Sequence, residues 1–229
     1  MHGPVKATVS QLRYTSVNLS GQFNPPTFAD TRIPVFGYLI KTKNSLVLVD
    51  SGVGVGNSYI EKKFAPEPSS FVAALAAHDV EPSDVDVLIN SHLHFDHCGN
   101  NVLCVNASIV VQSAELGAAR QPNYTVSDWF DYPSANLTSV DGDLEVETGV
   151  NVLAAPGHTP GHQSVLVDTG AERILIAAQA AFTSAEYQSG GDANTQAHEA
   201  LEDVYVDSLQ RLKSLNADKA YFSHDPTPA

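Results

Sequence analysis

Four side chains of metal-binding type lie close together near the middle of the chain, and the first comes three residues after the apolar run Val-Leu-Ile. They are His92, His94, Asp96 and His97. In an extended or looped segment, residues two apart point in the same direction, so the first three can converge while the fourth turns towards a neighbouring point. Imidazole and carboxylate groups bind zinc at about 2.0–2.2 Å. The cluster therefore predicts a divalent metal site.

Two more histidines follow strand-like runs in the second half of the chain. His158 lies in segment 155–164, Ala-Pro-Gly-His-Thr-Pro-Gly-His-Gln-Ser, where prolines and glycines predict a tight loop that aims the side chain outwards. His224 follows the run at 219–222 in the same manner. A histidine that stands alone is more often structural than a ligand, but beside the first cluster we expect both to bind metal.

The two cysteines, Cys98 and Cys104, are too few for a disulfide scaffold. We expect two reduced, buried thiols. Cys98 directly follows His97, but the histidines and the aspartate already supply enough ligands for a zinc site. We therefore do not assign Cys98 to the metal.

Strand-like runs precede these clusters and alternate with turns and helical segments. Strands are expected at 34–40, 45–50, 84–90, 109–112, 151–154, 165–168, 173–178 and 219–222. Helices are expected from 68–70 up to 78, over 114–119 and over 198–215. Residues 121–143 lack a clear period and predict a structured loop. Its Trp129, Phe130 and Tyr132 form either an apolar substrate wall or ordinary core or lid packing. This mixture, with a hairpin at 41–44, favours two sheets enclosed by helices.

Composition limits the partners. Twelve basic residues against 26 acidic residues give a net charge of −14. Such a charge repels phosphate backbones and anionic membrane surfaces, so we expect neither nucleic acid nor membrane, but a small neutral ester or lactone meets no such repulsion. No apolar run approaches the roughly 20 residues of a membrane span, and the start lacks a secretory signal, which predicts a cytoplasmic protein. A length of 229 residues predicts one domain, 1–229. The sequence does not specify the oligomeric state.

Together these motifs resemble those of the metallo-β-lactamase superfamily. The likeness is carried by His-x-His-x-Asp-His after a strand, by Pro-Gly-His-Thr-Pro-Gly-His and by a late histidine. Asp50-Ser51-Gly52 also matches the superfamily's early aspartate motif, so the landmarks run from Asp50 to His224 and cover nearly the whole chain. The resemblance implies an α/β (α+β) fold, the four-layered αβ/βα sandwich, with the site at one edge between two sheets.

The resemblance also implies which residues would bind metal. Matching positions assign one ion to His92, His94 and His158, and the other to Asp96, His97 and His224. Asp50 would orient a ligand or loop without touching the metal. His162, next to the second loop, is expected to orient a ligand or to be structural. The implied cofactor is zinc, as one or two ions.

Within the superfamily, His-Leu-His-Phe-Asp-His combined with Gly-His-Thr-Pro-Gly-His-Gln-Ser is most similar to the N-acyl homoserine lactonases. This similarity implies a metal-dependent hydrolase that opens a lactone by attack of metal-bound hydroxide, formed from a water whose pKa is lowered towards about 7. Asp96 is the candidate to pass the proton. Phe95 and Phe182 are the candidate substrate contacts.

Two residues depart from the family's pattern. Gln179 follows the run at 173–178, where the family has an aspartate that bridges both metals. A neutral amide offers one good oxygen ligand and no charge, so the second ion should be weakly held or absent. Phe182 stands where related lactonases have a tyrosine that hydrogen-bonds the substrate carbonyl. Loss of such a donor slows a reaction by roughly 100- to 1,000-fold where it matters.

Three alternatives share the motifs. A glyoxalase II-like thioesterase or a β-lactamase would have the same fold, although an anionic glutathione thioester favours basic residues and the chain has only 12. An iron enzyme similar to the superfamily's persulfide dioxygenases would need the carboxylate that Gln179 replaces. A catalytically weak relative with a binding or structural role is suggested by Gln179 and Phe182 together.

Overall fold

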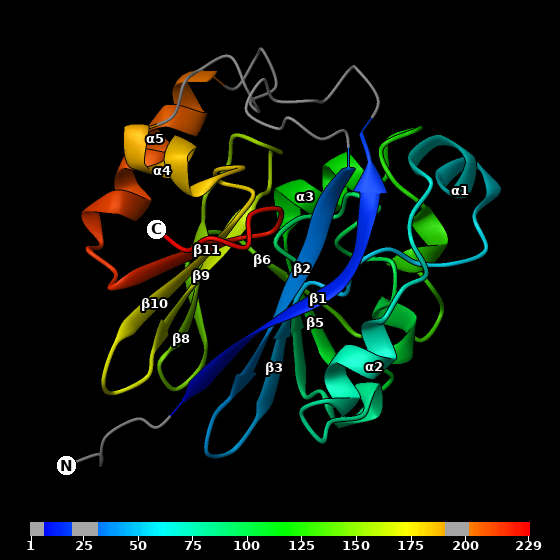
Figure 1. Cartoon of the computed structure of the whole chain (residues 1–229), viewed down its shortest axis with the longest axis horizontal. Coiled ribbons are helices and arrows are strands. Elements are labelled where there is room, and N and C mark those ends of the chain that lie inside the picture. The colour runs from blue at the N-terminus through cyan, green and yellow to red at the C-terminus, as the bar shows by residue number, and fades with distance from the viewer. Residues whose placement is uncertain (1–6, 20–31, 191–201) are drawn as a thin grey trace.

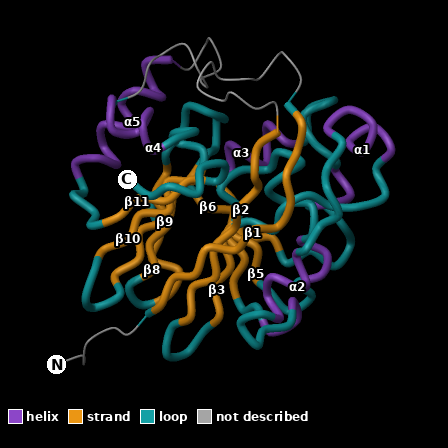
Figure 2. Tube along the Cα trace, viewed as in Figure 1, coloured by secondary structure: helices purple, strands orange, loops and turns teal. Residues whose placement is uncertain are grey.

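Two β-sheets lie face to face in the computed structural model, and helices cover the outer face of each (Figures 1 and 2). The structure describes residues 7–19, 32–190 and 202–229. Helices α1, α2 and α3 lie on the side of the first sheet, and α4 and α5 lie on the side of the second (Figure 1). The predicted four-layered sandwich is confirmed.

The strands follow a simple order in each sheet. The first sheet consists of β1 (Thr8–Asn18), β2 (Arg32–Lys41), β3 (Leu46–Val49), β4 (Val87–Ile89), β5 (Ser108–Gln112) and β6 (Leu137–Val140), in this spatial order. Its pairs are antiparallel up to β3 and parallel from β3 to β6. The second sheet consists of β11 (Lys219–Phe222), β10 (Arg173–Ala178), β9 (Gln163–Asp168), β8 (Val150–Ala154) and β7 (Leu144–Glu147), with only the β10–β11 pair parallel.

Four helices of the described residues have six or seven residues each, and α5 has 13. They are α1 (Ser58–Phe64), α2 (Phe71–Ala76), α3 (Ser113–Ala119), α4 (Ser184–Ser189) and α5 (Glu202–Ser214), with 3-10 turns at Pro82–Asp84, Asn101–Leu103 and Ser127–Trp129. Within the described ranges, none of the helices has the length and apolar character needed to cross a bilayer.

Apolar side chains fill the layer between the two sheets. Alternate residues of β2 point into this layer and into the cluster beneath the helices, as expected of a strand buried on both faces. The Tyr38 hydroxyl of β2 donates to the Phe222 carbonyl of β11 at 2.5 Å, and the Phe36 N–H donates to the Ser223 carbonyl at 2.9 Å. These bonds join the two sheets immediately before His224.

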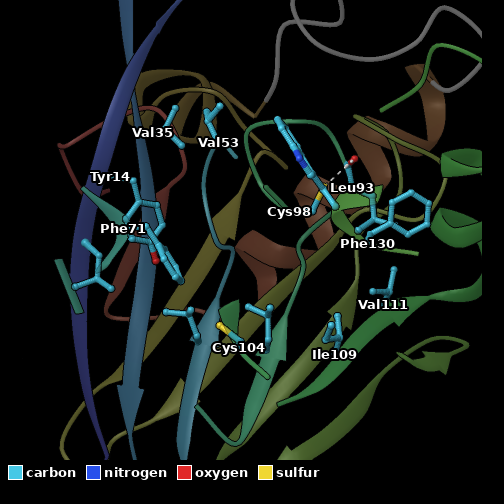
Figure 3. Close-up of a cluster of buried hydrophobic side chains, with 14 of the residues drawn as sticks. Tyr14, Val35, Val53, Phe71, Leu93, Cys98, Cys104, Ile109, Val111 and Phe130 are labelled. Carbon is cyan, nitrogen blue, oxygen red and sulfur yellow. Dashed lines mark hydrogen bonds between the residues drawn. The ribbon is translucent and has the colours of Figure 1, made fainter. Parts of the chain in front are cut away.

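A second apolar cluster packs between the first sheet and its helices (Figure 3). Phe71 of α2 lies against Tyr14 of β1, with ring centroids 5.3 Å apart. Trp129 and Phe130 are buried in the same cluster. Core packing, rather than a substrate wall, is therefore the role of these two residues in the structure.

Several elements differ from the sequence prediction. Residues 121–143 do not form a single loop, because they contain a 3-10 turn and the strand β6, which pairs with β5. β6 has little buried surface, so its apolar alternation is weak. The strands β1 and β7 and the helices α1 and α4 were not predicted. The helix predicted over 198–215 is present as α5, while residues 198–201 lie outside the described residues.

Gly99 holds the loop after β4 against the loop after β3. Its N–H donates to the Gly52 carbonyl at 2.7 Å, and a Cβ at Gly99 would lie 1.8 Å from the Gly54 nitrogen. Since backbone atoms cannot move aside as a flexible side chain can, Gly99→Ala should lower the free energy of unfolding by about 3 kcal/mol. Urea unfolding of the metal-free protein, followed by circular dichroism, measures this change.

The matched control is Gly117 in α3, where an added Cβ would meet nothing within 4 Å. Gly117→Ala should raise the free energy of unfolding by about 0.5–1 kcal/mol, because alanine restricts the unfolded chain and favours the helix. Equal stabilities of the two variants would contradict the close approach at Gly99.

Candidate metal centre

Three histidines bring their ring nitrogens together where the loops after β4 and β8 meet. We call His92, His94 and His158 the first trio. The Nε2 atoms of His92 and His158 lie 3.0 Å and 3.3 Å from the Nδ1 atom of His94. Two nitrogens bound to one tetrahedral zinc ion at about 2.0–2.1 Å are roughly 3.3 Å apart. The spacing of the first trio therefore suits a shared ion.

A second group of ligand atoms lies beside the first. We call Asp96, His97 and His224 the second trio, and all three side chains are buried. The Oδ2 atom of Asp96 lies 3.6 Å from the Nε2 atom of His97 and 3.5 Å from that of His224. His97 lies in the loop after β4 of the first sheet, and His224 lies in the loop after β11 of the second. The second trio therefore combines residues from loops of both sheets.

Buried polar atoms that lack hydrogen-bond partners indicate what the second trio could bind. Among the described residues, these atoms include the Nε2 atoms of His97 and His224 and the Oε1 atom of Gln179. The Nδ1 atoms of the two histidines face the Asp50 carboxylate and the Pro34 carbonyl, each at 2.8 Å. A proton on Nδ1 leaves the lone pair on Nε2. Since buried polar atoms normally have partners, the set fits a metal ion.

Asp50 connects the ends of two neighbouring strands behind His97. It has a left-handed backbone, with φ of 61°. Its carboxylate accepts the N–H and the hydroxyl of Ser91, both at 2.7 Å, and faces the Nδ1 atom of His97. A left-handed conformation at a non-glycine residue costs of order 1–3 kcal/mol and persists only where surrounding contacts hold it. This geometry suits a residue that orients His97.

His162 lies close to the first trio but has both ring nitrogens engaged. Its Nδ1 atom faces the Ala155 carbonyl at 3.1 Å, and its Nε2 atom accepts the backbone N–H of Gln179 at 3.2 Å. A ring used in this way has no nitrogen left for a metal. His162 instead holds the backbone at Gln179 in place.

Burial and neighbouring charges set the protonation of these side chains. Burial lowers the pKa of His92 well below its usual value and lowers the pKa of His224 to about 4, so both rings are in the neutral, ligand-competent form. Burial also opposes protonation of His97, but the charges of Asp96 and Asp50 raise its pKa overall. Burial opposes ionisation of Asp96, but His97 and His224 outweigh it and lower the pKa of the carboxyl group.

The remaining predicted residues lie around the second trio. Gln179 follows β10 and is buried, and its side chain faces His97. Phe182 is also buried, and its ring stacks on that of His224 with centroids 4.8 Å apart. Phe95 is half-buried and stacks on Phe64 of α1 at 4.2 Å. Of the two predicted substrate contacts, Phe95 is therefore the more exposed.

Cys98 lies in the apolar cluster (Figure 3). Its sulfur lies 3.5 Å and 3.4 Å from the carbonyl oxygens of Leu93 and His94. Burial raises the pKa of this thiol. Cys98 is thus a buried, protonated thiol, as is expected of a core cysteine.

One residue of the site was missed by the sequence analysis. Glu115 is fully buried beneath the two histidine loops. In the sequence it is the third residue of α3, and acids are common in the first turn of a helix because they face its positive end. Its type and position therefore carry no signal of a buried role.

Residues 30–224 match the sequence profile of the metallo-beta-lactamase superfamily. The chain belongs to this superfamily. It is 32% identical to an N-acyl homoserine lactonase of a Bacillus species, over 96% of this chain and 91% of that relative. It is 31% identical to an N-acyl homoserine lactonase of Bacillus cereus, over 84% of this chain and 82% of that relative.

Solved structures agree with this membership. The chain resembles an N-acyl homoserine lactone hydrolase that has the product N-hexanoyl-L-homoserine bound at its catalytic metal centre. The TM-score is 0.80 at 26% identity, covering 98% of this chain and 95% of that chain. The superfamily inferred from the sequence motifs is confirmed.

Proposed function

We propose that this protein is a zinc-dependent hydrolase that opens N-acyl homoserine lactones or closely related lactones. The observation that carries the proposal is the pair of adjacent ligand trios, in which two buried Nε2 atoms lack hydrogen-bond partners. Relatives that align over most of the chain are N-acyl homoserine lactonases, which supports the choice of substrate class.

Zinc would be held by the first trio and, more weakly, by the second. Bound zinc would polarise the lactone carbonyl and activate a water at neutral pH. The second trio has one carboxylate, Asp96, and the neighbouring Gln179 offers only a neutral oxygen. The weaker site is therefore expected beside Gln179.

Asp96 is our candidate for proton transfer. Hydrolysis adds water across the acyl C–O bond, so the attacking oxygen loses a proton and the leaving alcohol oxygen gains one. The pKa of Asp96 is lowered by His97 and His224 in spite of burial, so the carboxylate is ionised and can accept that proton.

A neutral, partly apolar substrate suits the rest of the chain. The net charge of −14 disfavours anionic substrates. The half-buried Phe95 lies next to Asp96 in sequence and stacks on Phe64, which makes this aromatic pair our candidate contact for an acyl chain.

Removal of metal is expected to slow lactone hydrolysis strongly. Purified protein should release acid from N-hexanoyl homoserine lactone, and chelator treatment should slow the reaction at least about 100-fold because the carbonyl and the water lose their activation. Added zinc should restore the rate, with zinc content measured on the same sample. A glutathione thioester and a penicillin serve as comparison substrates. Zinc-loaded protein that leaves every lactone intact would contradict the proposal.

A further inference from the structure

Glu115 is a buried carboxylate that the proposed reaction does not use. Its Oε1 atom accepts hydrogen bonds from the Leu93 N–H at 2.8 Å and the Tyr124 hydroxyl at 2.5 Å. Its Oε2 atom accepts from the Thr159 hydroxyl at 2.6 Å and the Gly161 N–H at 3.2 Å. Because every partner donates, the surroundings match the ionised form, which only accepts hydrogen bonds.

The donors to Glu115 come from the segments that carry the first trio. Leu93 lies between His92 and His94, and Thr159 directly follows His158. The loop at Gly161 approaches so closely that an added Cβ would lie 2.1 Å from the Glu115 nitrogen. Two of the donors, at Leu93 and Gly161, are backbone groups. Glu115 therefore fixes the paths of both loops.

The Tyr124 hydroxyl links a third segment to the same carboxylate. Its ring also lies against the first trio, with its centroid 5.0 Å from that of His94. A buried carboxylate is strongly unfavourable unless it is fully hydrogen-bonded, and charge-assisted bonds are roughly twice as strong as neutral ones. The three segments are thus held together by one charged group.

The charge of Glu115 also reaches the first trio. Its carboxylate binds the N–H of Leu93, which lies between two of the ligands, and the hydroxyl of Thr159, which directly follows the third. The three ligands of the first trio are imidazoles and contribute no negative charge. A buried anion next to them compensates a bound cation without touching it.

We infer that Glu115 is a positioning residue for the first trio: it clamps the loops of His94 and His158 at metal-binding distance and supplies the negative charge that this trio lacks. The inference rests on the proposed zinc site. The second trio is oriented by different groups, the Asp50 carboxylate and the Pro34 carbonyl. Glu115 should therefore affect one trio and spare the other.

Zinc titration of metal-free protein against a chromophoric chelator tests this selectivity. His158→Ala and His224→Ala identify the binding phases of the first and second trios. Glu115→Gln should weaken the phase that His158→Ala removes by about 10- to 100-fold, and change the other phase by less than about threefold. Circular dichroism and urea unfolding of the same metal-free samples report whether the variants fold.

Glu186→Gln is the matched control. The Glu186 carboxylate likewise accepts from a tyrosine hydroxyl, that of Tyr205 at 2.5 Å, and from a backbone N–H, that of Phe182 at 2.7 Å. Neither of these two hydrogen bonds is made by the loops of the first trio. This variant should lose stability but keep the zinc affinity of the first trio.

Thr159→Val provides a milder second test if Glu115→Gln does not fold. It removes one donor to Glu115, should weaken the first phase by about tenfold, and should be rescued by Thr159→Ser. Folded variants with unchanged first-phase affinity, or with both phases weakened equally, would overturn the inference and leave the zinc site intact. Wild-type protein that bound no zinc would overturn the proposed function and this inference with it.

Discussion

Replacing Asp96 by asparagine is expected to slow lactone hydrolysis by about 1,000-fold, within the range for groups that transfer protons in a transition state. The asparagine side chain keeps the shape and one oxygen, but it cannot carry the proton. In the native protein burial opposes ionisation of Asp96, but His97 and His224 outweigh it and lower the pKa, so the side chain is an ionised carboxylate. Initial rates of acid release at saturating zinc measure the loss.

The control separates proton transfer from metal binding, because Asp96 is also a member of the second trio. His224→Ala removes a ligand of the same trio and leaves the carboxylate in place. At equal zinc content, Asp96→Asn should be slower than His224→Ala by at least about tenfold if the carboxylate carries a proton. Equal rates, or an Asp96→Ala variant as active as the wild type, would leave Asp96 without that role.

The sequence was most informative where the chemistry is local. His92, His94, Asp96 and His97 lie in one short segment after an apolar strand, so their common direction follows from backbone periodicity. The loop around His158 is defined by its own prolines and glycines. Such local patterns specify which side chains can meet even when the partner segments are unknown.

Residues whose role depends on distant contacts could not be predicted in this way. In the sequence Glu115 is indistinguishable from an exposed helix residue. Its buried role depends on contacts with Leu93 and Gly161, which are distant in the sequence. Trp129 and Phe130 could equally have lined a substrate pocket, and only the packing of their segment against the first sheet puts them in the core. Both cases turn on which surfaces become buried, which is a property of the whole fold.

Gln179→Asp is expected to strengthen zinc binding by the second trio by about 100-fold and to bring the zinc content towards two ions per chain. The Gln179 side-chain oxygen is buried and lacks a hydrogen-bond partner, and the backbone N–H of this residue is held by His162 at 3.2 Å. A negative charge about 4 Å from a unit positive charge is worth about 4 kcal/mol at an effective dielectric constant of 20. Desolvation of the carboxylate offsets part of this Coulomb energy. A remainder of about 3 kcal/mol corresponds to the expected gain of about 100-fold in zinc affinity. Chelator competition measures the affinity.

The comparison with Gln179→Asn identifies the cause, because asparagine shortens the side chain as aspartate does but adds no charge. If charge is decisive, Gln179→Asn should bind zinc no more tightly than the wild type, and Gln179→Glu should recover part of the gain. If aspartate and asparagine gave the same affinity, side-chain length and not charge would limit the second trio. The side chain of the native glutamine would then be too long to bind the ion well. The expectation that the second trio binds zinc weakly because it lacks negative charge would be wrong.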